Sequence, residues 1–348
     1  MATITSTTTL QDSDLTLEVF DIPSSRVVHG KAFPLGLHPK DGAVPGDINS
    51  AVRYLENIAK TGAFRSLLSQ HGAILFRGLP IKNAQDFSKF VTAFQLPQPH
   101  REVGLAGKRT TVTTNIKTAN EEPPDVKFYY HSEYGRSAYF PGVLFFFSEI
   151  VPEQGGQTPL LSSLELYDRL AADLPEFLKD LSEKGGNDSY GFEIKDGDSL
   201  EVQREKVETV LRDTLQAKAE WQPNGSLHVL QHLPAIRRIG STGKPTFFNG
   251  FAGVYGRGRD NNALEPPYRG IDEKYHLPTT YGDGTAIPVE YQERLLEISD
   301  EIGFLTPWQP GDVALIDNYT VQHARTPWKG DRSLLVSLWD GHEKFVPL

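Results

Sequence analysis

Two histidines and a glutamate in this chain could together bind a divalent metal ion. His131 and Glu133 form an H-x-E motif at the end of the aromatic segment KFYYHSE. Because side chains alternate in direction along a strand, both should point to the same side and could reach one ion. Two histidines and one carboxylate on one face of Fe(II) leave the opposite coordination positions open. The motif therefore predicts a mononuclear iron site that needs one further histidine.

The H-x-E motif alone is a weak signal, because it occurs twice. The other copy, His100 and Glu102, lies in PQPHREVG, where the prolines and polar residues indicate a solvated loop. With 10 histidines and 45 acidic residues in 348 positions, roughly one such motif is expected by chance. The segment YFPGVLFFF, which follows His131, could instead line the interior of a barrel. This position favours His131 and Glu133.

The second histidine has several candidates, and each could be an ordinary core or surface residue: His228, His232, His276, His323 and His342. His323 follows the predicted strand GDVALIDN by a short turn and precedes a strand that begins with Arg332. One hairpin could then carry a metal ligand and a cation to the same cavity. We therefore choose His323 as the third ligand.

Arg332 needs an explanation, because the alternate positions along its strand would face the core: Leu334, Val336 and Leu338. A buried guanidinium is costly unless an anion pairs with it. One interpretation is an internal salt bridge, and the other is a bidentate clamp on the distal carboxylate of 2-oxoglutarate. Thr158, in the short strand after GGQ, could donate a hydroxyl to that carboxylate, although it could also be a simple strand residue.

The substrate pocket has five candidate side chains. Four aromatic residues could form its wall, although each could equally be core: Tyr129, Tyr130, Tyr134 and Phe248. Arg325, two residues after His323, could meet a substrate carboxylate. An ion pair of Arg325 with Asp317 or Asp331 is the alternative.

The elements that must position these residues can be read from the spacing of apolar side chains. Helices are predicted over about 49–69, from an Asn83 cap with Phe87, Phe90, Val91 and Phe94 at helical spacing, over 163–184 and over 289–302. Strands are predicted at GAILFRGLP, VKFYYHSE, VLFFFSEI, GGQTPLL, SLHVL, TFFNGF, GDVALIDN and RSLLVSLW, the last two paired antiparallel. Strands at both ends with helices outside predict a mainly β fold with flanking helices and a jelly-roll core.

Composition narrows the function classes. The chain has no cysteine, so every metal ligand must be a histidine or a carboxylate. A net charge of −10 without a basic patch argues against nucleic acid. The sequence shows neither the apolar core of a signal peptide nor a membrane span, so we expect a cytoplasmic protein. We expect a flexible leader over 1–14 and a single domain over 15–348, with an insertion at about 185–285 and possible homo-oligomers.

At these residues the chain resembles the TauD/TfdA-like Fe(II)/2-oxoglutarate-dependent dioxygenases, most closely their SyrP-like and clavaminate-synthase-like branches. The resemblance spans roughly 30–342 and rests on GAILFRGLP, HSEYGRSAYFPGVLFFFSEIVPEQGGQTPL, AEWQPNGSLHVLQHLPAI, TGKPTFFN, YGDGTAIP and WQPGDVALIDNYTVQHARTPWKGDRSLLVSLW. It implies a double-stranded β-helix in which His131, Glu133 and His323 bind Fe(II). Arg332 and Thr158 would then hold 2-oxoglutarate. Most of the wider family has aspartate where this chain has Glu133, and several relatives have a longer interval between the histidine and the arginine.

The resemblance implies an oxygenase that consumes O2 and 2-oxoglutarate and releases succinate and CO2. Its substrate would be a small molecule, an amino acid or a metabolite derived from one, oxidised at an unactivated C–H bond. Hydroxylation is the default, while desaturation, cyclisation and epimerisation would leave the same sequence signature. A zinc-dependent hydrolase could use the same three residues, but it would give no reason for a buried Arg332, and no H-E-x-x-H helix is present. A non-catalytic jelly-roll binding protein is the third alternative.

Overall fold

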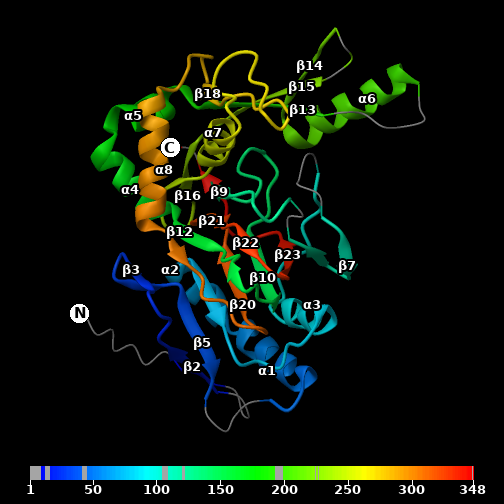
Figure 1. The fold of residues 1–348 in the computed structure, drawn as a ribbon. Helices are drawn as coiled ribbons and strands as arrows, with labels where there is room; N and C mark the ends of the chain where they lie inside the picture. Colours follow the sequence, from blue (N-terminus) through cyan, green and yellow to red (C-terminus); the bar gives the residue numbers. More distant parts are fainter. Residues whose placement is uncertain are drawn as a thin grey trace.

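The structure is a computed structural model, which describes residues 9–11, 16–40, 45–103, 109–119, 122–192, 199–223, 225, 227–346 and 348 (Figure 1). Most of the leader expected over 1–14 lies outside the described residues. Within it, β1 (Leu10–Gln11) pairs with β2 (Thr16–Phe20). No described helix is long and apolar enough to cross a bilayer.

Two antiparallel sheets form the centre of the molecule. The larger has the order β1-β2-β5-β6-β20-β10-β23-β8-β7, in which only β5 and β6 pair in parallel. Its remaining strands are β5 (Leu35–Pro39), β6 (Ala73–Phe76), β7 (Thr111–Thr113), β8 (Ile116–Thr118), β10 (Val143–Ile150), β20 (Val313–Asp317) and β23 (Ser333–Trp339). The second sheet has the order β19-β12-β21-β9, formed by β9 (Phe128–His131), β12 (Pro159–Ser162), β19 (Phe304–Leu305) and β21 (Val321–Arg325).

Apolar side chains from both sheets meet in one buried cluster. Phe146 of β10, Ile316 of β20 and Val336 of β23 come from the larger sheet. Leu160 of β12 and Val321 of β21 come from the second sheet. Two antiparallel sheets that face each other across such a layer are what a jelly-roll core requires. The prediction of a β core with flanking helices is confirmed.

Helices α1 (Ile48–Lys60), α2 (Ala63–His71) and α3 (Ala84–Thr92) cover the outer face of the larger sheet (Figure 1). Phe87 of α3 stacks on Phe147 of β10 with ring centroids 5.1 Å apart. Asn83 caps α3 as predicted, because its side chain accepts the backbone N–H of Asp86 at 2.9 Å. The prediction of a single helix over 49–69 is wrong. The helix is interrupted at Gly62, whose φ of +79° lies in the left-handed region, and α2 begins after it.

Four helices cover the outer face of the second sheet: α4 (Ser163–Asp173), α5 (Pro175–Lys184), α7 (Phe251–Asp260) and α8 (Val289–Ile302). The helix predicted over 289–302 is confirmed as α8. The helix predicted over 163–184 is divided into α4 and α5, because Pro175 cannot continue a preceding helix.

The region of the expected insertion contains a separate sheet of order β14-β15-β13-β18 together with a helix. Its elements are β13 (Gly186–Phe192), α6 (Leu200–Val210), the π-helix η1 (Leu211–Leu215), β14 (Lys218–Trp221), β15 (Leu227–Leu233) and β18 (Thr280–Tyr281). Figure 1 shows α6 and β14 at the end of the molecule opposite to β2 and α1. The remaining strands are β3 (Arg26–Val28), β4 (Lys31–Phe33), β11 (Gln154–Gly155), β16 (Ile236–Ile239), β17 (Pro245–Phe247), β22 (Trp328–Lys329) and β24 (Phe345–Val346).

The strand order corrects two expectations that concern the metal site. The segments GDVALIDN and RSLLVSLW do not pair with each other: β20 and β23 lie on opposite sides of β10. The near-continuous apolar sequence of β10 suits a central strand that is buried on both faces. His323 was expected in a turn but lies inside β21 of the second sheet, so no single hairpin carries both His323 and Arg332.

Candidate metal centre

The structure brings His131, Glu133 and His323 together. His131 ends β9 and lies directly opposite His323 of β21 in the antiparallel register. Their ring centroids are 4.5 Å apart. One potential ligand atom from each of the three residues lies within 4.8 Å of the others. This spacing would allow all three to contact one cation.

Glu133 is not positioned by the strand alternation that the sequence analysis predicted. Strand β9 ends at His131, so strand alternation does not orient Glu133. Asn318, in the turn between β20 and β21, holds the backbone of Glu133 from both sides. Its Oδ1 accepts the N–H of Glu133 at 2.8 Å, and its Nδ2 donates to the carbonyl of Glu133 at 2.9 Å. The turn that leads to His323 therefore also places Glu133.

His131 presents a nitrogen lone pair to this space. The Nδ1 atom of His131 is 2.8 Å from the carbonyl oxygen of Tyr129, which assigns the proton to Nδ1 and leaves Nε2 free as a ligand. Burial, together with the nearby charge of His323, lowers the pKa of His131 to about 4. His131 is therefore neutral at pH 7, as metal binding requires.

Glu133 supplies the negative charge. Burial alone would raise the pKa of its carboxyl, but the charge of Arg109 holds that pKa well below its usual range. Its Oε2 atom is buried, accepts no hydrogen bond within the described part of the chain, and lies 3.3 Å from Nε2 of His323. An ionised oxygen without a donor beside two imidazoles fits a divalent cation.

An ion-pair chain lies behind Glu133, and the sequence analysis did not find it. Arg109 donates from Nη2 to Oε1 of Glu133 at 2.8 Å and from Nη1 to Oε1 of Glu102 at 2.9 Å. Lys117 donates to Oε2 of Glu102 at 2.8 Å. Arg109 belongs to no motif. The only member of this ion-pair chain that the sequence analysis considered is Glu102, which belongs to the H-x-E copy that we set aside.

The interpretation of His100 as part of a solvated loop is wrong. Its side chain is fully buried, and its Nδ1 is 2.7 Å from Oδ1 of Asp340. Its ring lies 4.4 Å from that of Tyr139, centroid to centroid. Pairing with Asp340 satisfies Nδ1, whereas Nε2 is buried and has no hydrogen-bond partner among the described residues. His100 is not part of the three-residue cluster.

Arg332 contacts Gly156, which precedes Thr158 by two positions in the sequence. Arg332 donates from Nε to the carbonyl of Gly156 at 2.9 Å, and its guanidinium lies 5.1 Å from the centre of the Trp328 ring. Among the described residues no carboxylate forms an ion pair with Arg332, and burial lowers its pKa to about 10. Thr158 is buried, and its hydroxyl accepts Nε1–H of Trp308 at 3.1 Å.

Three of the four aromatic pocket candidates have contacts typical of core residues. Tyr129 donates its hydroxyl to Asp260 of α7 at 2.9 Å. Tyr130 is buried in the cluster under α8 and closely approaches Gly303. Phe248 is fully buried, with its ring 4.7 Å from that of Phe140.

Tyr134 differs from these three. Its φ of +54° is rare for a bulky residue and occurs directly after Glu133. Its ring makes an edge contact with His100 at 5.7 Å. Its hydroxyl is buried and has no hydrogen-bond partner among the described residues.

Arg325 holds a loop in place. Its guanidinium donates to the backbone carbonyls of Glu122, Pro123 and Val126 at 3.2, 2.9 and 2.9 Å. It also lies 4.5 Å from the centre of the Phe128 ring. The ion pair with Asp317 or Asp331, which was the alternative for Arg325, is not among the contacts seen in the described part of the chain. The carboxylate of Asp317 instead accepts the hydroxyl of Thr320 at 2.8 Å.

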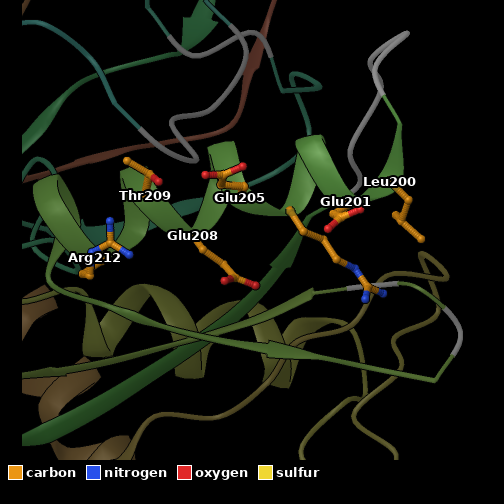
Figure 2. A pocket seen from close by; sticks show the side chains of 7 residues that line it. Leu200, Glu201, Glu205, Glu208, Thr209 and Arg212 are labelled. Carbon is orange, nitrogen blue, oxygen red and sulfur yellow. The ribbon is translucent and has the colours of Figure 1, made fainter.

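A surface pocket lies along α6, away from these residues in the sequence (Figure 2). Its lining is mostly charged: Leu200, Glu201, Arg204, Glu205, Glu208, Thr209 and Arg212. Trp221 donates to Glu208 at 2.6 Å, and the guanidinium of Arg204 lies 4.6 Å from the centre of the Trp221 ring. None of the three clustered residues lines this pocket.

Known proteins are similar to this chain over most of its length. The model of the family described as "Taurine catabolism dioxygenase TauD, TfdA family" matches residues 35–339. A clavaminate synthase-like protein from Arabidopsis thaliana is 33% identical over 342 residues, covering 94% of this chain and 99% of that protein. The dapdiamide synthesis protein DdaC from Enterobacter agglomerans is 28% identical over 290 residues, covering 79% and 84%.

Among solved structures, a putative alpha-ketoglutarate-dependent taurine dioxygenase from Burkholderia xenovorans is similar in fold, with a TM-score of 0.50 and 14% identity. The alignment covers 95% of this chain and 98% of that one.

Proposed function

The chain belongs to the taurine catabolism dioxygenase TauD, TfdA family, and from this premise we propose that it is an Fe(II)- and 2-oxoglutarate-dependent oxygenase acting on a small molecule. The family makes it an oxidoreductase. The oxidised group would be an unactivated C–H bond of an amino acid or of a metabolite derived from one, with hydroxylation as the default outcome.

The proposal assigns His131, Glu133 and His323 as the iron ligands. The observation that carries it is the approach of three potential ligand atoms to within 4.8 Å, with Glu133 and His323 buried. A neutral His131 and an ionised Glu133 supply the donor types that Fe(II) accepts. Bound Fe(II) would supply the redox chemistry that couples decarboxylation of 2-oxoglutarate to oxidation of the substrate. The chain's own residues position the reactants.

Arg332 and Thr158 would hold the distal carboxylate of 2-oxoglutarate. An internal salt bridge was the alternative for Arg332, but its described contacts are a backbone carbonyl and an indole ring. A buried guanidinium with these partners still lacks an anion. The hydroxyl of Thr158 accepts a hydrogen bond from Trp308, so its own proton is available to a carboxylate.

The proposed substrate class comes from the relatives of the chain. The names of two relatives refer to clavaminate and to dapdiamide synthesis, and we extend to this chain the idea of a small-molecule substrate. We propose Tyr134 as a wall residue of the substrate pocket, because its buried hydroxyl has no partner among the described residues.

Product analysis of the purified, iron-loaded enzyme tests this proposal. With 2-oxoglutarate and O2, we expect succinate, and a panel of amino acids and their derivatives should contain a substrate that gains one oxygen. His131→Ala and His323→Ala should lose both iron and succinate formation, whereas His100→Ala should retain both. Unchanged iron content in the first two variants would refute the ligand assignment. Hydrolysis that proceeds without O2 would favour the zinc hydrolase instead.

A further inference from the structure

We propose that Arg109 is a positioning residue that limits Glu133 to binding the metal through a single oxygen. This inference rests on the proposed function, because it concerns the same metal site. It assigns a role to an arginine that none of the motifs contains.

The contacts of Glu133 make its two carboxylate oxygens unequal. Oε1 accepts a charge-assisted hydrogen bond from Nη2 of Arg109 at 2.8 Å. Oε2 accepts none among the described residues and lies 3.3 Å from Nε2 of His323. Arg109 therefore occupies one oxygen and leaves the other directed toward the histidines.

Arg109 is itself fixed. Its side chain is 10% exposed, and its other terminal nitrogen donates to Glu102 at 2.9 Å. Glu102 in turn accepts from Lys117 at 2.8 Å. Two carboxylates and two cations alternate along this chain of contacts, so their charges balance. The bond to Glu102 therefore anchors the guanidinium of Arg109 beside Glu133.

The number of coordination positions shows why one oxygen matters. An octahedral Fe(II) held by one oxygen of Glu133 and one nitrogen of each histidine would keep half of its coordination positions open. A chelating 2-oxoglutarate would take two of these positions and would leave one for O2. If Glu133 bound through both oxygens, it would fill that last position.

The length of the glutamate side chain makes this control necessary. Glutamate has one more rotatable bond than aspartate, so its carboxylate can turn more freely. Outer hydrogen bonds orient metal-binding carboxylates in general. Asn318 fixes only the backbone of Glu133, and the orientation of the carboxylate is left to Arg109.

Nitric oxide tests the open position without turnover, because it binds Fe(II) as an analogue of O2 and gives an EPR signal. Arg109→Met removes the donor and keeps most of the side-chain volume. Under anaerobic conditions with Fe(II) and 2-oxoglutarate, we expect this variant to keep the visible charge-transfer band of wild type. Its affinity for nitric oxide should fall about 10-fold or more. Arg109→Lys should recover part of that affinity, because an ammonium can still donate to Oε1.

Arg77→Met is the matched control. Arg77 forms a comparably buried ion pair with Asp312, with Nη2 2.7 Å from Oδ2, and contacts none of the three ligands. It should lose stability but bind nitric oxide as wild type does. The role of Arg109 would be overturned if Arg109→Met bound nitric oxide as tightly as wild type, or if Arg77→Met lost as much affinity as Arg109→Met. It would also be overturned if Arg109→Lys bound nitric oxide as weakly as Arg109→Met. Complete loss of iron from Arg109→Met would have the same consequence. A wild-type protein without the charge-transfer band would instead refute the proposed function.

Discussion

Replacing Arg332 with leucine should separate a ligand-binding role of this residue from a structural one. Burial lowers the pKa of Arg332 to about 10 from an ordinary 12.5, which corresponds to a cost on the order of 3 kcal/mol for keeping it charged. A charge-assisted pair with 2-oxoglutarate contributes ~3 kcal/mol. At ~1.4 kcal/mol per decade, its loss should raise the dissociation constant of 2-oxoglutarate ~100-fold.

The stability of the ligand-free protein should not fall in Arg332→Leu. The variant loses the hydrogen bond to Gly156, worth ~1 kcal/mol, but it no longer buries an unpaired cation. We would titrate 2-oxoglutarate under anaerobic Fe(II) and record a thermal melt of each protein. Arg325→Leu is the comparison, because Arg325 holds three backbone carbonyls and should affect the melt more than the titration. If Arg332→Leu unfolds the protein, or binds 2-oxoglutarate as tightly as wild type, the clamp assignment is refuted.

Three further variants probe neighbouring residues. Thr158→Val should weaken 2-oxoglutarate about fivefold, the effect of one hydrogen bond of ~1 kcal/mol, and an unchanged titration would remove Thr158 from the clamp. His100→Ala should keep its iron but melt at a lower temperature, because it breaks the buried pair with Asp340; iron loss would mean that the wrong H-x-E was chosen. Burial, reinforced by the charge of Glu343, raises the pKa of Asp317 from an ordinary 3.8 to about 7, so the stability that its protonated form contributes is complete below pH 3.8 and is lost progressively as the pH rises to about 7. Denaturant unfolding should therefore show Asp317→Asn gaining stability over wild type as the pH rises from about 4 to about 7, and a constant difference would contradict this.

Local patterns predicted the elements whose signals are themselves local. The α8 helix, the Asn83 cap and the buried strand β10 follow from apolar spacing and from one hydrogen-bonding side chain. The two divided helices could have been predicted as well, because Gly62 and Pro175 are ordinary helix breakers.

Strand order could not be predicted in the same way. The apolar patterns of β20 and β23 fit pairing with each other as well as pairing with β10. The choice between these arrangements depends on the packing of the whole sheet, which no short segment encodes. The expected hairpin with His323 and Arg332 was wrong for this reason, although both residues were correctly singled out as the ones to explain.

Sequence analysis could identify the residues of the candidate site only where they belong to a short motif or to a rare residue type. His131 and Glu133 stand in a short motif, and the chain has 10 histidines from which to choose the third ligand. Arg109 is one of 35 basic residues and pairs with Glu133 across 24 positions. No spacing rule connects two such residues, so only the fold brings them together.

The visible spectrum of the protein under anaerobic conditions tests the central claim most directly. Fe(II) is added first and 2-oxoglutarate second, so that chelation of the metal by the cosubstrate is observed without turnover. We predict a charge-transfer band that grows with 2-oxoglutarate to one equivalent per chain and is absent from His131→Ala and His323→Ala. Failure of the band to form in iron-loaded wild type, or its persistence in both alanine variants, would contradict the account.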